Sequence, residues 1–89
     1  MNKAAGKVIK AFREHLNYNL EYVANRLNIS IALLTNIESG EVGLEIEKLY
    51  HLSKLFGVVP LVIFDIIEEV YHDKEGYSLD NAIIELKIN

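Results

Sequence analysis

Residues 20–40 read LEYVANRLNISIALLTNIESG, and this stretch decides the fold. Its first part, residues 20–27, has apolar side chains at the spacing that places them on one side of a helix. Asn19 precedes this segment and is a good N-cap, while Asn28 follows it and readily takes the left-handed conformation that ends a helix. The small side chain of Ala24 would let a second helix cross closely. The stretch therefore begins with a short helix that stops at a tight turn.

The second part of the stretch predicts another helix over residues 31–39. Ser30 would cap its start, and Gly40 would end it. Leu34 and Ile37 give this helix an inward side, which leaves its first turn free to project outward. Two short helices on a tight turn, with the second helix exposed at its start, form the layout of a helix-turn-helix.

Helical spacing of apolar residues predicts three further helices, over 3–16, 45–56 and 60–71. Pro60 suits the first turn of the last of them, because the N–H that proline lacks would have no partner there. Residues 78–88 fit either a helix capped by Ser78 or a strand. The inward side of the helix over 45–56 should hold Ile46, Leu49, Leu52, Leu55 and Phe56.

The chain has 89 residues, a length typical of one domain, and its net charge is −4. An acidic balance alone argues against a nucleic-acid-binding protein, which is usually basic. The charge is unevenly divided, however. Residues 1–40 carry five basic and three acidic side chains, whereas residues 41–89 carry four basic and ten acidic ones. The helix-turn-helix stretch therefore lies in the half with a net positive charge.

Four pieces of sequence follow one another in a fixed order. They are Arg13, L-x-x-VA-x-x-L-x-IS over 20–30, L-x-x-IE-x-G over 34–40, and L-x-x-LS-x-x-F-x-V over 49–58. In this order and spacing they resemble the phage Cro/repressor-type (XRE-like) helix-turn-helix family over most of residues 5–65. The resemblance implies a bundle of five helices that binds double-stranded DNA, usually as a homodimer on a palindromic operator. It also implies an ion pair between Arg13 and Glu38, which either fixes the recognition helix and leaves Arg13 close to a phosphate or is purely structural.

We therefore expect an all-α fold, with a five-helix helix-turn-helix domain over residues 1–65 and a C-terminal extension, helix or strand, over residues 66–89. The helix over 60–71 has more apolar side chains than a small core needs, and an exposed apolar patch typically marks an interface. The extension would serve dimerisation, unless the tail over 77–89 folds back onto the helix of its own chain. The expected dimer interface consists of Val62, Ile63, Ile66, Ile67, Val70 and Tyr71.

The resemblance also implies a function. The chain would be a sequence-specific transcriptional regulator that inserts the helix over 30–39 into the major groove. The expected base contacts are Ile31, Ala32, Leu33, Thr35 and Asn36. The expected phosphate contacts are Lys7, Lys10, Arg13, Asn19, Arg26 and Ser30.

The sequence departs from the family pattern in two places. Leu20 stands where the family often has a glutamine. Ile31, Ala32 and Leu33 stand where polar base-reading side chains are usual, and apolar side chains can read only the methyl group of thymine. One interpretation is an A/T-rich DNA target. A second is a face that binds another protein, as in an antitoxin or a partner that sequesters a regulator. In a third, one or two of these residues pack inward.

Catalysis has little support in the sequence. The three histidines are scattered, there is no cysteine, and no glycine-rich loop would hold a phosphate. We expect neither an enzyme nor a bound cofactor or metal. No apolar run is long enough for a membrane span and no targeting segment stands out, so the cytoplasm is the expected location. The expected partners are DNA, a second copy of the chain and, in the alternative, another protein.

Overall fold

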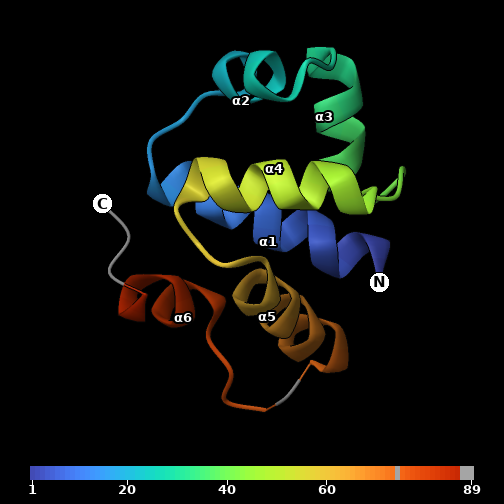
Figure 1. Cartoon of the computed structure of the whole chain (residues 1–89). Helices are drawn as coiled ribbons and strands as arrows, with labels where there is room; N and C mark the ends of the chain where they lie inside the picture. Colours follow the sequence, from blue (N-terminus) through green and yellow to red (C-terminus); the bar gives the residue numbers. More distant parts are fainter. Residues whose placement is uncertain (74, 87–89) are drawn as a thin grey trace.

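Within residues 1–73 and 75–86, which the computed structural model describes, the chain forms six helices and no strand (Figure 1). Each of the five helices expected up to residue 71 forms with its bounds shifted by at most one residue. The helices are α1 (Asn2–His15), α2 (Leu20–Leu27), α3 (Ile31–Ser39), α4 (Ile46–Phe56), α5 (Pro60–His72) and α6 (Leu79–Glu85).

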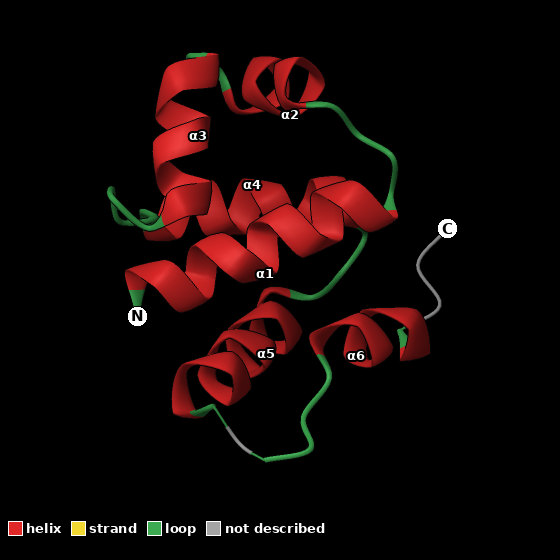
Figure 2. Cartoon of the chain, turned by 180° about the vertical axis from the view of Figure 1, so that it is seen from behind, coloured by secondary structure: helices red, strands yellow, loops and turns green. Residues whose placement is uncertain are grey.

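The helices are arranged around α1, which contacts α3, α4, α5 and α6. Figures 1 and 2 show α2 and α3 at one end of the molecule, α1 and α4 across the middle, and α5 and α6 at the other end. This arrangement separates the helix-turn-helix from the C-terminal helices by the thickness of the core.

The core is apolar and is centred on α1. Val8, Ile9 and Phe12 of α1 are fully buried, and the ring of Phe12 stacks on Phe56 of α4 with 5.3 Å between ring centroids. Side chains from every helix join this cluster, including Ile83 of α6. Burial of these side chains, at about 25 cal/mol per Å² of apolar surface, is the main source of stability for so short a chain.

The ends of α2 and α3 follow the predicted local chemistry. The side chain of Asn19 accepts a hydrogen bond from the Tyr22 N–H, and that of Ser30 accepts one from the Leu33 N–H. Asn28 ends α2 at φ 57°, and Gly40 ends α3 at φ 84°, both in the left-handed region. The predicted caps and stops of the two helices are therefore confirmed.

The backbones of α1 and α3 touch at Gly6. A Cβ atom built on Gly6 would collide with the carbonyl oxygens of Ile37 and Glu38. Only glycine therefore fits at this crossing, and the absence of a side chain lets α3 lie directly on α1.

In the C-terminal half, the structure corrects the prediction for Ile46 and decides between the two alternatives for residues 78–88. Ile46 was expected on the inward side of α4, but it is 85% exposed. It is the first residue of α4, and side chains of a helix lean toward its N-terminus, so Ile46 points past the helix end. Of the two alternatives for residues 78–88, a helix and a strand, the helix forms. Ser78 caps it, and it extends to Glu85. Ile88 lies outside the described residues.

The apolar residues of α5 divide differently from the prediction. Ile63, Ile66 and Ile67, which were expected in the dimer interface, are buried in the core of their own chain and are not on the surface of the protomer. Val62 and Val70 are half-buried against the same core, and Tyr71 is exposed. The apolar side chains that do reach the surface at the start of this helix are Val59, Leu61 and Phe64, which we call the α5 apolar face. Residue 65, the expected end of the first domain, lies inside the continuous α5.

No single helix among the described residues has both the length and the apolar run that a membrane crossing requires. α4 and α5 meet that test only when taken as a pair, and the pair is bent by 107°.

Candidate nucleic-acid interface

The exposed side of α3 carries the five residues expected to contact bases. Ile31, Ala32 and Thr35 are exposed, and Leu33 and Asn36 are half-buried. We call these five residues the α3 outer face. Beneath them, Leu34 and Ile37 are buried and fix which side of α3 faces outward. Ile31 and Ala32 are therefore surface residues and do not pack inward.

The hydroxyl groups of α3 are bonded to the helix itself. The Ser30 Oγ accepts from the Leu33 N–H at 3.0 Å, which is its capping bond. The Thr35 hydroxyl donates to the Ile31 carbonyl oxygen at 2.9 Å, and the Ser39 hydroxyl donates to the Asn36 carbonyl oxygen at 3.0 Å. Asn36 is thus left as the only side chain of the α3 outer face with free amide donors among the described residues.

An ion pair anchors α3 to α1. The Nε of Arg13 donates to Oε2 of Glu38 at 2.7 Å, and Nη2 donates to Oε1 at 3.0 Å. Nη1 donates to the Tyr18 carbonyl oxygen at 3.0 Å, which ties in the turn between α1 and α2. The two side chains are 11% and 7% exposed. Hydrogen bonding to Glu38 raises the pKa of Arg13, although partial burial opposes the shift.

Arg13 is therefore mostly committed inside the protein. Three of its five N–H groups have protein partners, which leaves little of the guanidinium for a phosphate. The structure brings Arg13 and Glu38 together, as the resemblance implied, and the pair removes the one negative charge of α3 from its surface.

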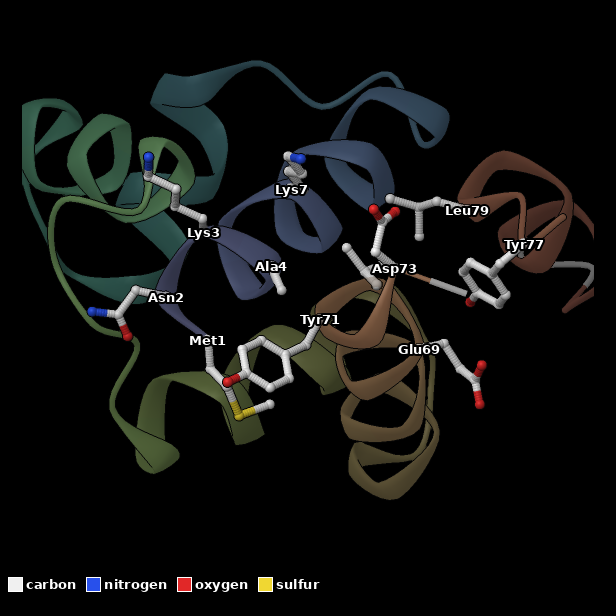
Figure 3. A pocket seen from close by; sticks show the side chains of 11 residues that line it. Met1, Asn2, Lys3, Ala4, Lys7, Glu69, Tyr71, Asp73, Tyr77 and Leu79 are labelled. Atoms are coloured by element: carbon white, nitrogen blue, oxygen red, sulfur yellow. The ribbon is translucent and has the colours of Figure 1, made fainter. Parts of the chain in front are cut away.

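Lys3 and Lys7 of α1 lie beside the C-terminal helices, and Lys3 also lies at the end of α3. Lys3 and Lys7 line one side of an open groove of about 760 Å³, and Glu69 and Asp73 line another side (Figure 3). The stem of Lys3 also packs on the end of α3, since a Cβ on Gly40 would meet it. A phosphate bound to Lys7 would compete with these carboxylates for the positive charge of the lysine.

Tyr77 forms part of the same groove, with its ring directed toward α5 (Figure 3). Burial raises the pKa of Tyr77, and the nearby carboxylate of Glu69 adds to the shift. The groove therefore mixes positive and negative groups and does not present a single sign of charge.

Arg26 meets a second group of basic side chains on α4. With His51 and Lys54 it lines a small groove of about 210 Å³ between α2 and α4. The guanidinium of Arg26 bonds the Tyr22 hydroxyl at 3.0 Å, and Lys54 lies 5.1 Å from the centre of the Tyr50 ring. His51 and Lys54 were missed in the sequence, where only their spacing on the outward side of α4 could have drawn attention to them.

Of the other expected phosphate contacts, Lys10 is exposed on α1 and Asn19 is exposed at the start of α2. The Asn19 oxygen is used in the cap, but its amide donors remain. Glu21 follows in the first turn of α2 and places a negative charge near this helix start. Within residues 1–73 and 75–86 no group of histidine, aspartate and glutamate is gathered in a way that could hold a metal ion.

Comparison with known proteins agrees with this geometry. A family model described as a helix-turn-helix domain matches residues 6–65, which include α2, α3 and the ion pair. No curated protein and no solved structure matches the chain. Because the matched segment covers more than half of the sequence, the chain belongs to the helix-turn-helix domain family.

Proposed function

We propose that this helix-turn-helix protein is a sequence-specific transcriptional regulator of the Cro/repressor type, which inserts α3 into the major groove of DNA. The observation that carries the proposal is the orientation of α3. The Arg13–Glu38 pair and the buried Leu34 and Ile37 hold one side of the helix inward, and they leave its first turn exposed. In helix-turn-helix proteins, residues of the first turn contact base edges.

The charge around α3 supports this role in spite of the acidic total. The α3 outer face has no charged residue, and Glu38 is neutralised by Arg13. Lys7, Lys10 and Arg26 are the cations we assign to phosphates, and Asn19 and Ser30 would donate from the starts of α2 and α3. Lys54 and His51 join Arg26 as further candidates.

The regulator would act as a homodimer that forms through the C-terminal half. The α5 apolar face is suited to this role because Val59, Leu61 and Phe64 are 61%, 73% and 44% exposed. Two copies related by a two-fold axis would each present this face to the other. Each α3 helix would then read one half-site of a palindromic operator. In this proposal residues 66–89 complete the dimerisation segment, the protein works in the cytoplasm, and it has no catalytic activity.

Titration of the full chain against random and A/T-rich duplexes tests the proposal. If about three cations per protomer neutralise phosphates, the dimer should bind with a slope near −5 in a plot of log affinity against log salt. Fluorescence anisotropy at several salt concentrations measures this slope. The absence of salt-sensitive binding to every duplex would contradict the proposal, and capture of a protein through α3 would then favour the alternative of a protein-binding module.

A further inference from the structure

The α3 outer face is poor in groups that can hydrogen-bond a base. The hydroxyl protons of Thr35 and Ser39 are already donated to the backbone of α3, at 2.9 Å and 3.0 Å. The Ser30 oxygen is occupied by the Leu33 N–H. A hydroxyl that turned to a base would give up one of these bonds, so its net gain would be small.

The apolar residues on this face are placed where bases are read. Ile31 and Ala32 are the first two residues of α3, and Ile31 is 44% exposed. Leu33 adds a half-buried side chain beside them. These side chains offer no donor or acceptor, and the C5 methyl group of thymine is the apolar group that ordinary DNA presents in the major groove.

Asn36 supplies the remaining polar contact. It lies one helical turn after Ala32, and its side-chain amide has no hydrogen-bond partner among the described residues. An asparagine amide can bond adenine N6 and N7 at the same time. Adenine pairs with thymine, so the amide contact and the methyl contacts select the same base pair.

We infer that α3 reads its operator through the methyl groups of thymine, with Ile31 and Leu33 as the methyl-contacting residues and Asn36 as the reader of adenine. This inference rests on the proposed function and names the DNA that it requires. 5-Methylcytosine carries its methyl group at the same place in the major groove. It should therefore replace thymine in the methyl contact, although not in the contact that Asn36 makes with adenine.

The test begins with a tight-binding duplex that the full chain selects from a random library. Each thymine is then replaced by deoxyuridine, which removes only the methyl group and keeps the base pair. We expect affinity to fall about fourfold for each contacted methyl group. Changing a contacted T·A pair to C·G should weaken binding, and methylation of that cytosine at C5 should restore the methyl part of the loss.

Variants assign the effect to residues. Ile31→Ala should bring the affinities for the thymine and deoxyuridine duplexes close together, because the side chain that senses the methyl group is gone. Ile46→Ala removes the same atoms from an exposed isoleucine on α4 and should leave the affinity ratio unchanged. Asn36→Ala should abolish the preference for A·T at one position in each half-site and keep the sensitivity to methyl groups elsewhere.

The outcomes separate this inference from the proposed function. Specific binding that is indifferent to deoxyuridine at every position would overturn the inference and leave the proposed function standing. If no duplex binds in a salt-sensitive manner, both are overturned. Selection of a G·C-rich site, or a protein partner captured in place of DNA and lost in the variant Ile31→Gln with Leu33→Gln, would also overturn the inference.

Discussion

The α3 outer face and the α5 apolar face both expose large apolar side chains, yet their surroundings differ. α3 carries one acid, Glu38, and Arg13 neutralises it inside the protein. On α5, the exposed Asp65 and Glu68 follow Leu61 and Phe64 by one helical turn, so acids continue the same side of the helix. The carboxylates on α5 would repel phosphates, whereas the α3 outer face has no charge that would do so. Exposed apolar area alone does not tell which partner a surface takes, whereas the charges around it do.

The two regions also differ in how they are held. α2 and α3 begin with side-chain caps, and α3 is tied to α1 by a two-point ion pair. α5 begins at Val59 without a side-chain cap. The polar contact between α1 and α6 is an exposed bond between His15 and Asp80. The end with α2 and α3 therefore carries a two-point ion pair in addition to its helix caps, whereas the end with α5 and α6 has one side-chain cap, at Ser78, and the exposed His15–Asp80 bond.

The largest effect should come from breaking the ion pair. Arg13→Met leaves the Glu38 carboxylate 7% exposed without its cation, so we expect the free energy of unfolding to fall by about 3 kcal/mol. Urea unfolding followed by circular dichroism measures the change. Lys48→Met, which breaks the exposed pair with Glu45, is the matched control and should cost at most about 1 kcal/mol. Equal losses in the two variants would show that burial does not set the buried Arg13–Glu38 pair apart from an exposed ion pair.

The next largest effect should come from the α5 apolar face. Leu61→Gln with Phe64→Gln should leave the fold intact, since both side chains are exposed, and should prevent dimerisation. Loss of the second half-site contact should lower operator affinity about 100-fold. Analytical ultracentrifugation gives the mass, and anisotropy gives the affinity.

The matched variant on the other surface is Ile31→Gln with Leu33→Gln. It should keep the dimer mass and lose sequence preference. A variant pair in which both surfaces change the dimer mass would contradict the assignment of separate partners.

A smaller effect is expected at the helix starts. Ser30→Ala removes the cap of α3 and should cost about 1 kcal/mol in unfolding free energy. Glu45→Ala at the start of α4, where no side-chain cap is made, should cost less than about 0.5 kcal/mol. Thermal or urea unfolding of the two variants provides the comparison, and a larger cost at Glu45 would argue against capping as the cause.

The smallest effect concerns pH at the C-terminal end. Burial raises the pKa of Tyr77 in the folded chain, so the unfolded chain releases this proton first as the pH rises. The contribution of this raised pKa to the free energy of unfolding is complete below the ordinary tyrosine pKa of about 10 and is lost as the pH rises above it. Tyr77→Phe should therefore lose less stability than the natural chain as the pH rises above about 10. Identical alkaline profiles from urea unfolding would show that the Tyr77 hydroxyl contributes nothing.

The parts of this structure that sequence predicts are those set by neighbouring residues. Asn19, Ser30 and Gly40 act on the turn that contains them, so their residue types were sufficient to place the ends of α2 and α3. Burial on α5 was not predictable in this way. Ile63 and Ile67 are buried because α1 and α6 pack against α5, and the sequence does not state these contacts, although Asp65 and Glu68 mark the side of Leu61 and Phe64 as the outward one.

The groove lined by Arg26, His51 and Lys54 was likewise not predictable from local sequence. Arg26 meets Lys54 because α2 and α4 come together in space, and each residue alone resembles an ordinary surface cation. The apolar α3 outer face, in contrast, was visible in the sequence, because a helix of known direction places Ile31 and Ala32 outward.

The contact at Gly6 has a consequence for the geometry of an operator. With no side chain between α1 and α3 at Gly6, and with Arg13 bonded to Glu38 at the far end of α1, the last turn of α3 is held at two points along α1. The distance between the cations of α1 and the first turn of α3 is therefore fixed by the fold. If α3 reads DNA as proposed, a duplex whose bound phosphate and contacted base pair lie at a different spacing would have to bend or twist to fit, so the deformation would fall on the DNA.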